Sequence, residues 1–109
     1  MQSYKIVTQI QHQQASGKPY LEFLREPSMS LGIYTLPVGG VDLQQPHTED
    51  EVYYVVHGRA MIRVGDEDSH IQPGCVIFVA ANVPHHFHDI TEELSVLVFF
   101  APAEYSRKK

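Results

Sequence analysis

Polar side chains that could bind a metal ion or move a proton recur at every second position in the segment QPHTEDEV: Gln45, His47, Glu49 and Glu51. Side chains two positions apart share one face wherever the chain is extended, and Pro46 biases Gln45 towards that conformation. Imidazole and carboxylate groups together suit iron, manganese, nickel, copper or zinc. The segment is therefore either a solvated loop before a strand or a strand end that presents ligands into a cavity.

A second group of histidines follows in NVPHHFHD, where His85, His86 and His88 lie just beyond an apolar run. Strand parity places His85 and Phe87 on one face and His86 and His88 on the other. If His85 points inward, the other two histidines point outward. We keep His88, together with Glu49, as a candidate for moving protons or orienting a substrate.

The elements that must position these side chains are short runs rich in β-branched and aromatic residues and bounded by glycine, proline and aspartate. They predict six β-strands, at 21–26, 31–37, 51–56, 59–65, 75–80 and 94–102. The segment HGR is predicted to form the turn between the third and the fourth. Their spacing is typical of a sandwich or barrel. No window of a dozen residues keeps a helical period, so the sequence predicts an all-β chain whose polar segment 9–18 is loosely ordered.

The run VYYVV, residues 52–56, is hydrophobic at every position, so this strand is expected to be covered on both faces. A second sheet supplies one cover, and a subunit partner or the N-terminal segment supplies the other. In RAMIRV, by contrast, Arg59, Met61 and Arg63 share one face, which is expected to meet solvent or a partner. These patterns predict a homodimer, formed by sheet packing or by strand exchange through 21–26 or 31–36.

Composition limits the class of protein. With 109 residues, 43% of them hydrophobic, the chain suits one domain, which we place at 19–103 between a polar lead-in at 1–18 and a tail at 104–109. A net charge of −5, with no basic block before the closing RKK, disfavours nucleic-acid binding. No apolar run is long enough for a membrane span or a signal peptide. The single cysteine, Cys75, cannot form an internal disulfide, which favours a cytoplasmic location. Its apolar neighbours predict that it is buried, inert and structural.

The spacing of the first cluster resembles the first motif of the cupin family: glycine, five residues, His-x-His, three or four residues, glutamate, six residues, glycine. Here the corresponding positions are Gly39, Gln45, His47, Glu51 and Gly58. Every spacing matches, but a glutamine stands where the motif has its first histidine.

The second cluster resembles the second cupin motif: glycine, five residues, Pro-x-Gly, two residues, histidine, three residues, asparagine. The matching positions are Gly74, Ala80, Asn82, His85 and Asp89. The spacing is kept, while alanine, asparagine and aspartate replace the motif's proline, glycine and asparagine.

The resemblance implies a double-stranded β-helix, a jelly-roll barrel, with a divalent metal inside it. Carried over position by position, it makes His47, Glu51 and His85 the expected ligands, and Gln45 a weak neutral donor that binds the metal or a metal-bound water. Two imidazoles and one carboxylate suit ferrous iron, and manganese, zinc or nickel also accept such a set. Three strong ligands leave positions open, which favours catalysis or ligand capture over a closed structural site.

The function that follows from the resemblance is a metal-dependent enzyme acting on a small organic molecule in the barrel. Dioxygenation ranks first among its reactions, ahead of isomerisation or elimination. Two other functions stay open: a non-catalytic module that binds a small ligand or metal, and a metal-free cupin that uses a histidine and an acid as an acid–base pair. Turnover of candidate substrates separates the first from the second, and the response to a chelator separates it from the third.

Overall fold

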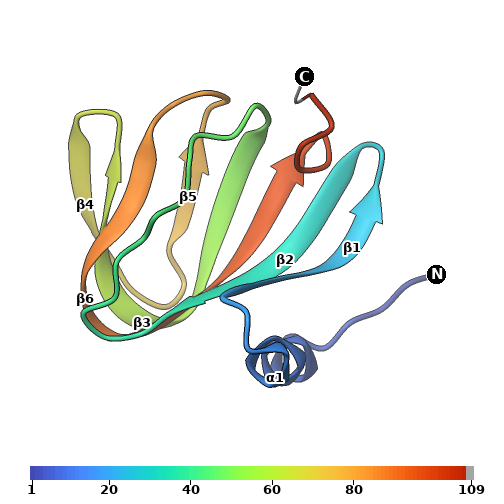
Figure 1. The fold of residues 1–109 in the computed structure, drawn as a ribbon, viewed down its shortest axis with the longest axis horizontal. Coiled ribbons are helices and arrows are strands. Elements are labelled where there is room, and N and C mark those ends of the chain that lie inside the picture. The colour runs from blue at the N-terminus through green and yellow to red at the C-terminus, as the bar shows by residue number, and fades with distance from the viewer. Residues whose placement is uncertain (108–109) are drawn as a thin grey trace.

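The computed structural model describes residues 1–107 of the chain, so the last two residues of the predicted tail lie outside the described residues. The described part contains one helix, α1 (Ile6–Ser16), followed by strands only. The strands are β1 (Tyr20–Glu26), β2 (Met29–Leu36), β3 (Asp50–Val64), β4 (Glu67–Ile71), β5 (Val76–Val79) and β6 (His85–Ala101). The prediction of a β-rich chain is confirmed. Figure 1 shows the strands wrapped round one interior, with α1 outside them beneath β1 and β2.

Two long strands, β3 and β6, form the centre of the sheet. The strand order is β1-β2-β6-β3-β4, with β5 also pairing with β3, and every pairing is antiparallel. The first half of β3 pairs with β5, and its second half pairs with β4. Because the two halves of β3 have different neighbours, and its register with β6 shifts at several bulges, the sheet curls on itself.

Gly58 lies inside β3, so the turn predicted at HGR is wrong. The register with β6 shifts before it at Val55/His57, across it at His57/Arg59 and after it at Arg59/Met61. Its φ is +98°, and a Cβ here would collide with the carbonyl oxygen of Glu93. Only glycine meets both demands without strain, so this position supports a bulge that bends a continuous strand.

The interior is filled by the alternating inward side chains of β3 and β6. Ala60 and Ile62 are buried, whereas Arg59 on the opposite face is exposed, which confirms the arginine face predicted for this segment. His85 and Phe87 are buried while His86 is exposed, as strand parity predicted. The core continues with further apolar residues of these strands: Tyr53, Val55, Leu94, Val96, Val98 and Phe100.

The outer face of the sheet carries two apolar rows that run across β2, β6, β3 and β5. The first row is Leu31, Phe99, Val52 and Phe78, and the second is Ile33, Leu97, Tyr54 and Val76. Phe78 is 60% exposed and Val76 is 66% exposed. The outer face of strand 52–56, predicted to be covered by a partner or by the N-terminal segment, is therefore left partly open to solvent by the described part of this chain.

Most of the segment 9–18, predicted to be loosely ordered, lies in α1. The helix contacts β1 and β2 and buries Gln9, Ile10 and Gln13. Gln13 Nε2 donates a hydrogen bond to the carbonyl of Lys18 at 2.7 Å, which satisfies this buried amide nitrogen. Glutamines carry most of the buried face, so no apolar period marks the helix in the sequence, although glutamine is a good helix former. At 11 residues, the helix found in 1–107 is too short to cross a membrane.

Candidate metal centre

The three strong ligands expected from the sequence meet inside the barrel. His47 lies in the loop before β3, Glu51 is the second residue of that strand, and His85 is the first residue of β6. The backbone N–H of Asn82 donates to the carbonyl of His47 at 2.7 Å, which ties the two motif segments together. Asn82 has φ +67°, and asparagine tolerates this left-handed conformation, so it can replace the motif's glycine.

The ligand atoms of this triad lie within 4.8 Å of one another. His85 Nε2 is 3.1 Å from Glu51 Oε1, and His47 Nδ1 is 3.5 Å from the same oxygen. All three atoms are buried, and within residues 1–107 none has a hydrogen-bond partner outside the triad. Donors bound to one ion at about 2.0–2.2 Å lie roughly 3.0–3.5 Å apart, and the two distances from Glu51 Oε1 fall in this range. A shared metal would satisfy all three atoms.

The second nitrogen of each histidine is held by another group. His85 Nδ1 lies 2.9 Å from the carbonyl oxygen of Val83, which can only accept, so Nδ1 carries a proton and Nε2 is the nitrogen that faces Glu51. His47 Nε2 lies 2.9 Å from the Oε2 of Glu104. Both rings are therefore held in an orientation that presents their other nitrogen to the triad.

In the metal-free protein, the protonated histidines and the ionised Glu51 carboxylate stabilise one another. Burial by itself lowers the pKa of His47, but the carboxylates of Glu104 and Glu51 outweigh it and raise the pKa to about 9. Burial also lowers the pKa of His85, yet Glu51 brings about a net rise. Burial raises the pKa of Glu51, but the two histidines outweigh it, and the net pKa is lowered. A metal ion would take the place of the protons on these histidines.

Glu49 and Gln45, which share strand parity with His47, have other positions. Glu49 is 1% exposed, and its carboxylate accepts from the backbone N–H of Tyr105 at 2.8 Å and from that of Arg107 at 3.1 Å. It also accepts from the Thr48 hydroxyl. It therefore holds the C-terminal segment and is not a member of the triad.

Gln45 is exposed, because the chain before His47 is not an extended strand. Gln44, its neighbour, lines the cavity instead, and its Oε1 accepts from the Tyr53 hydroxyl at 3.2 Å. Direct ligation by Gln45 stays a prediction.

His88 lies on the outer face of β6, opposite to the side occupied by His85 and Phe87. Its Nε2 is 2.8 Å from Asp68 Oδ1, and its Nδ1 is 2.9 Å from Asp89 Oδ2. These carboxylates raise its pKa. Because the sheet separates it from the triad, His88 is not placed to move protons there.

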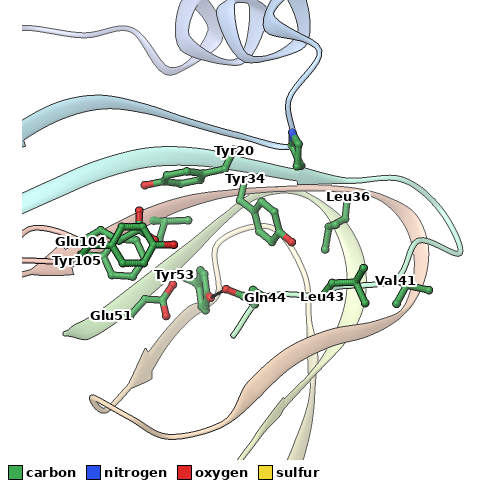
Figure 2. Close-up of a pocket in the computed structure, with 13 residues that line it drawn as sticks. Tyr20, Tyr34, Leu36, Val41, Leu43, Gln44, Glu51, Tyr53, Glu104 and Tyr105 are labelled. Carbon is green, nitrogen blue, oxygen red and sulfur yellow. Dashed lines mark hydrogen bonds between the residues drawn. The ribbon is translucent and has the colours of Figure 1, made fainter. Parts of the chain in front are cut away.

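A cavity of about 500 Å³ lies beside the triad. Figure 2 shows Glu51, Glu104 and Tyr105 at one end and Leu36, Val41 and Leu43 at the other. His47 packs against Phe100, and His85 packs against Tyr53; both aromatic rings line the cavity. The remaining lining residues are Pro19, Tyr20, Tyr34, Gln44 and Val98. One end of the cavity is therefore acidic and the other apolar.

Two residues of this site were missed by sequence reasoning. Glu104 was assigned to the tail, yet it is 9% exposed and contacts His47. Tyr20 starts β1, and its buried hydroxyl makes no hydrogen bond within residues 1–107. No local pattern marks either of them, because both enter the site through long-range folding.

The comparisons with known proteins identify the family. The sequence profile described as "Cupin domain" matches residues 32–101, and the chain belongs to the cupin family. The buried His47, Glu51 and His85 form a candidate metal site typical of cupins. The chain is also similar to the uncharacterized protein SCO3923 of Streptomyces coelicolor, with 52% identity over 90 residues that make up 83% of this chain and 86% of that protein.

Solved structures confirm the predicted jelly-roll barrel. The crystal structure of TT1209 from Thermus thermophilus superposes with a TM-score of 0.74 at 24% identity, covering 94% of this chain and 99% of that one. The DMSP lyase DddQ from Ruegeria pomeroyi superposes with a TM-score of 0.65 at 21% identity, covering 70% of this chain and 39% of that one. At these identities the likeness concerns the fold alone.

Proposed function

We propose that this protein is a metal-dependent cupin enzyme that acts on a small organic molecule. The observation that carries the proposal is the convergence of three buried atoms without hydrogen bonds, on His47, Glu51 and His85, beside a cavity of about 500 Å³. A cavity of this size suits a small ligand. A purely structural metal would need no such space next to it.

Ferrous iron is the metal we place first, ahead of manganese, zinc and nickel, because two imidazoles and one carboxylate form the set used by iron oxygenases. Such a metal, when bound, supplies a Lewis acid and sites for dioxygen and substrate oxygens. The reaction class we propose is dioxygenation, in which both atoms of O₂ enter the product and no external reductant is required. Isomerisation or elimination at the same site is the second class.

The shape of the cavity supports a substrate with oxygen atoms at one end and an apolar body. Glu51 lies at the acidic end and would hold the metal, which substrate oxygens would share. The opposite end, at Leu36, Val41 and Leu43, offers only apolar side chains. An apolar group placed there is removed from water, which favours binding.

Tyr20 is the side chain we propose for holding a substrate oxygen. Its hydroxyl lies over Gly32 on β2, where any Cβ would collide with the ring, so glycine makes room for it. Burial, followed by the charge of Glu104, raises the pKa of the hydroxyl, which therefore keeps its proton. A neutral buried O–H group with no hydrogen-bond partner among residues 1–107 is ready to donate to a ligand oxygen.

The experiment combines elemental analysis of untagged protein with oxygen-uptake assays on small carboxylic, phenolic and dihydroxy compounds. Enzyme function predicts a bound metal, turnover of at least one compound class, and loss of turnover in Glu51→Gln. In Tyr20→Phe we expect KM to rise about tenfold, because one hydrogen bond to a buried substrate oxygen is lost. Ligands that raise the melting temperature without turnover would instead support a binding module. Activity that survives complete removal of metal would support the metal-free acid–base alternative.

We also propose a homodimer as the assembly, with the outer apolar rows of β2, β6, β3 and β5 packed against their copies. Ile33 is buried within the chain, and the other seven positions in these rows are uncharged and half-buried or exposed. They suit a partner surface that is equally apolar, which a second copy of the same face provides. The exposure of Tyr54, Val76 and Phe78 in the single chain supports this assembly. Light scattering coupled to gel filtration measures it directly.

A further inference from the structure

We propose that Glu104 is a positioning residue that orients His47 for metal binding, and that Glu49 holds Glu104 in place. The proposal rests on the metal-dependent function above. It adds to the triad a carboxylate from the C-terminal segment, which follows β6 and lies outside both cupin motifs.

The contact between Glu104 and His47 is of the kind that tunes a metal ligand. Glu104 Oε2 lies 2.9 Å from His47 Nε2, and both side chains are almost completely buried. A carboxylate on the outer nitrogen of a ligating imidazole fixes the ring orientation and makes the other nitrogen more basic. Here that other nitrogen is Nδ1, the atom that faces Glu51 at 3.5 Å without a hydrogen bond.

The backbone of Glu104 is anchored to the strands beneath it. Its N–H donates to Ser30 Oγ at 2.9 Å, and its carbonyl accepts from Arg25 Nη2 at 2.8 Å. Ser30 lies on β2 and Arg25 on β1. The side chain of Glu104 therefore extends towards His47 from a fixed point, as Figure 2 shows for its place at the end of the cavity.

Glu49 secures the residues that follow Glu104. Its carboxylate oxygens separately accept the backbone N–H groups of Tyr105 at 2.8 Å and Arg107 at 3.1 Å. An ionised carboxylate offers two acceptor oxygens, whereas the amide of a glutamine offers one oxygen and an NH₂ group that would oppose a backbone N–H. This requirement explains a fully buried acid that does not belong to the triad. We therefore expect Glu49 to act on the metal site mainly through the position of Glu104.

The test is a Co²⁺ titration of the full chain, followed by absorption and by competition with a chelator. We compare wild type with Glu104→Ala, Glu104→Gln, Glu49→Gln and the Glu49→Gln/Glu104→Ala double variant. Glu93→Gln is the matched control, because Glu93 is exposed and lies on β6. Thermal unfolding followed by circular dichroism confirms that each variant is folded.

We expect Glu104→Ala to weaken Co²⁺ binding by about 10- to 100-fold, with unchanged positions and intensities of the cobalt bands, since the ligands stay the same. Glu104→Gln keeps an acceptor for His47 Nε2–H and should recover part of the affinity. Glu49→Gln should weaken binding by several-fold alone but by less than about twofold in the Glu104→Ala background, because its effect passes through Glu104. Glu93→Gln should bind like wild type.

Several results would overturn the proposal. Equal Co²⁺ affinity in wild type and both Glu104 variants would remove the positioning role. Changed cobalt bands in Glu104→Ala would make Glu104 a ligand instead. Additive effects in the double variant would show that Glu49 acts by another route. If wild type itself fails to bind Co²⁺, the proposed metal-dependent function fails. If wild type binds Co²⁺ and the Glu104 variants bind it equally well, only the positioning role of Glu104 fails.

Discussion

Replacing Glu51 with glutamine in the metal-free protein should lower the pKa of His47 by about 1 to 2 pH units. The wild-type pKa of His47 is raised to about 9, because Glu104 and Glu51 together outweigh the effect of burial. Glu51→Gln removes one of these two charges and keeps the shape of the side chain. Glu104 remains 2.9 Å from His47 Nε2, so the variant should still titrate above the ordinary value of about 6.5.

The same shift sets the pH dependence of folding stability. The pKa of His47 is higher in the folded protein than in the unfolded chain, so its stabilising contribution is complete below about pH 6.5. That contribution is lost as the pH rises through about 9. At 1.36 kcal/mol per pKa unit it amounts to at most about 3 kcal/mol, and roughly half of that if solvent screens the ion pairs. Glu51→Gln should therefore destabilise the protein more at about pH 6.5 than above pH 9.

The assay follows the ring Hε1 resonances of the seven histidines by NMR as the pH is raised, with His47→Gln to assign the His47 signal. Asp68→Asn is the matched control. It removes a carboxylate 2.8 Å from His88 on the outer face, and should lower the pKa of His88 while leaving that of His47 unchanged. A wild-type His47 midpoint near the ordinary value, or a midpoint unaffected by Glu51→Gln, would refute the electrostatic account of the triad.

Three further predictions follow from the fold and the site. Ferrous or manganous ion at about 100 times its Kd should raise the free energy of unfolding by about 2.7 kcal/mol in chemical denaturation, and no change would contradict a site formed by folding. Gly58→Ala should destabilise the protein by more than about 2 kcal/mol, because φ is +98° and the Cβ meets backbone; a Tm like wild type would show that β3 can shift. Phe78→Glu should convert a dimer to a monomer in light scattering, since the side chain is 60% exposed on the apolar rows, and an unchanged mass would exclude this face as the interface.

The triad could be predicted from the sequence because motif spacing reports it. His47, Glu51 and His85 keep the distances that two strand ends of a cupin barrel require, and strand parity sorts His85 from His86 because that segment is extended. The same parity argument failed for Gln45, which precedes the strand in an irregular loop. Parity predicts facing only where the backbone is regular.

The remaining features depend on contacts that no local pattern encodes. Glu104 reaches His47 only after β6 has ended and the chain has been anchored by Arg25, Ser30 and Glu49. The helix α1 buries glutamines, so it lacks an apolar stripe. Gly58 looks like a turn residue in the sequence, because a bulge and a turn both favour positive φ.

The most direct test of the central claim is the metal content of untagged protein reconstituted without chelator and measured by elemental analysis. Wild type should retain about one transition-metal ion per chain, and His85→Ala less than about a tenth of that, because a triad atom is lost. A wild type that retains no metal after reconstitution, or a His85→Ala variant that retains as much as wild type, would contradict that claim.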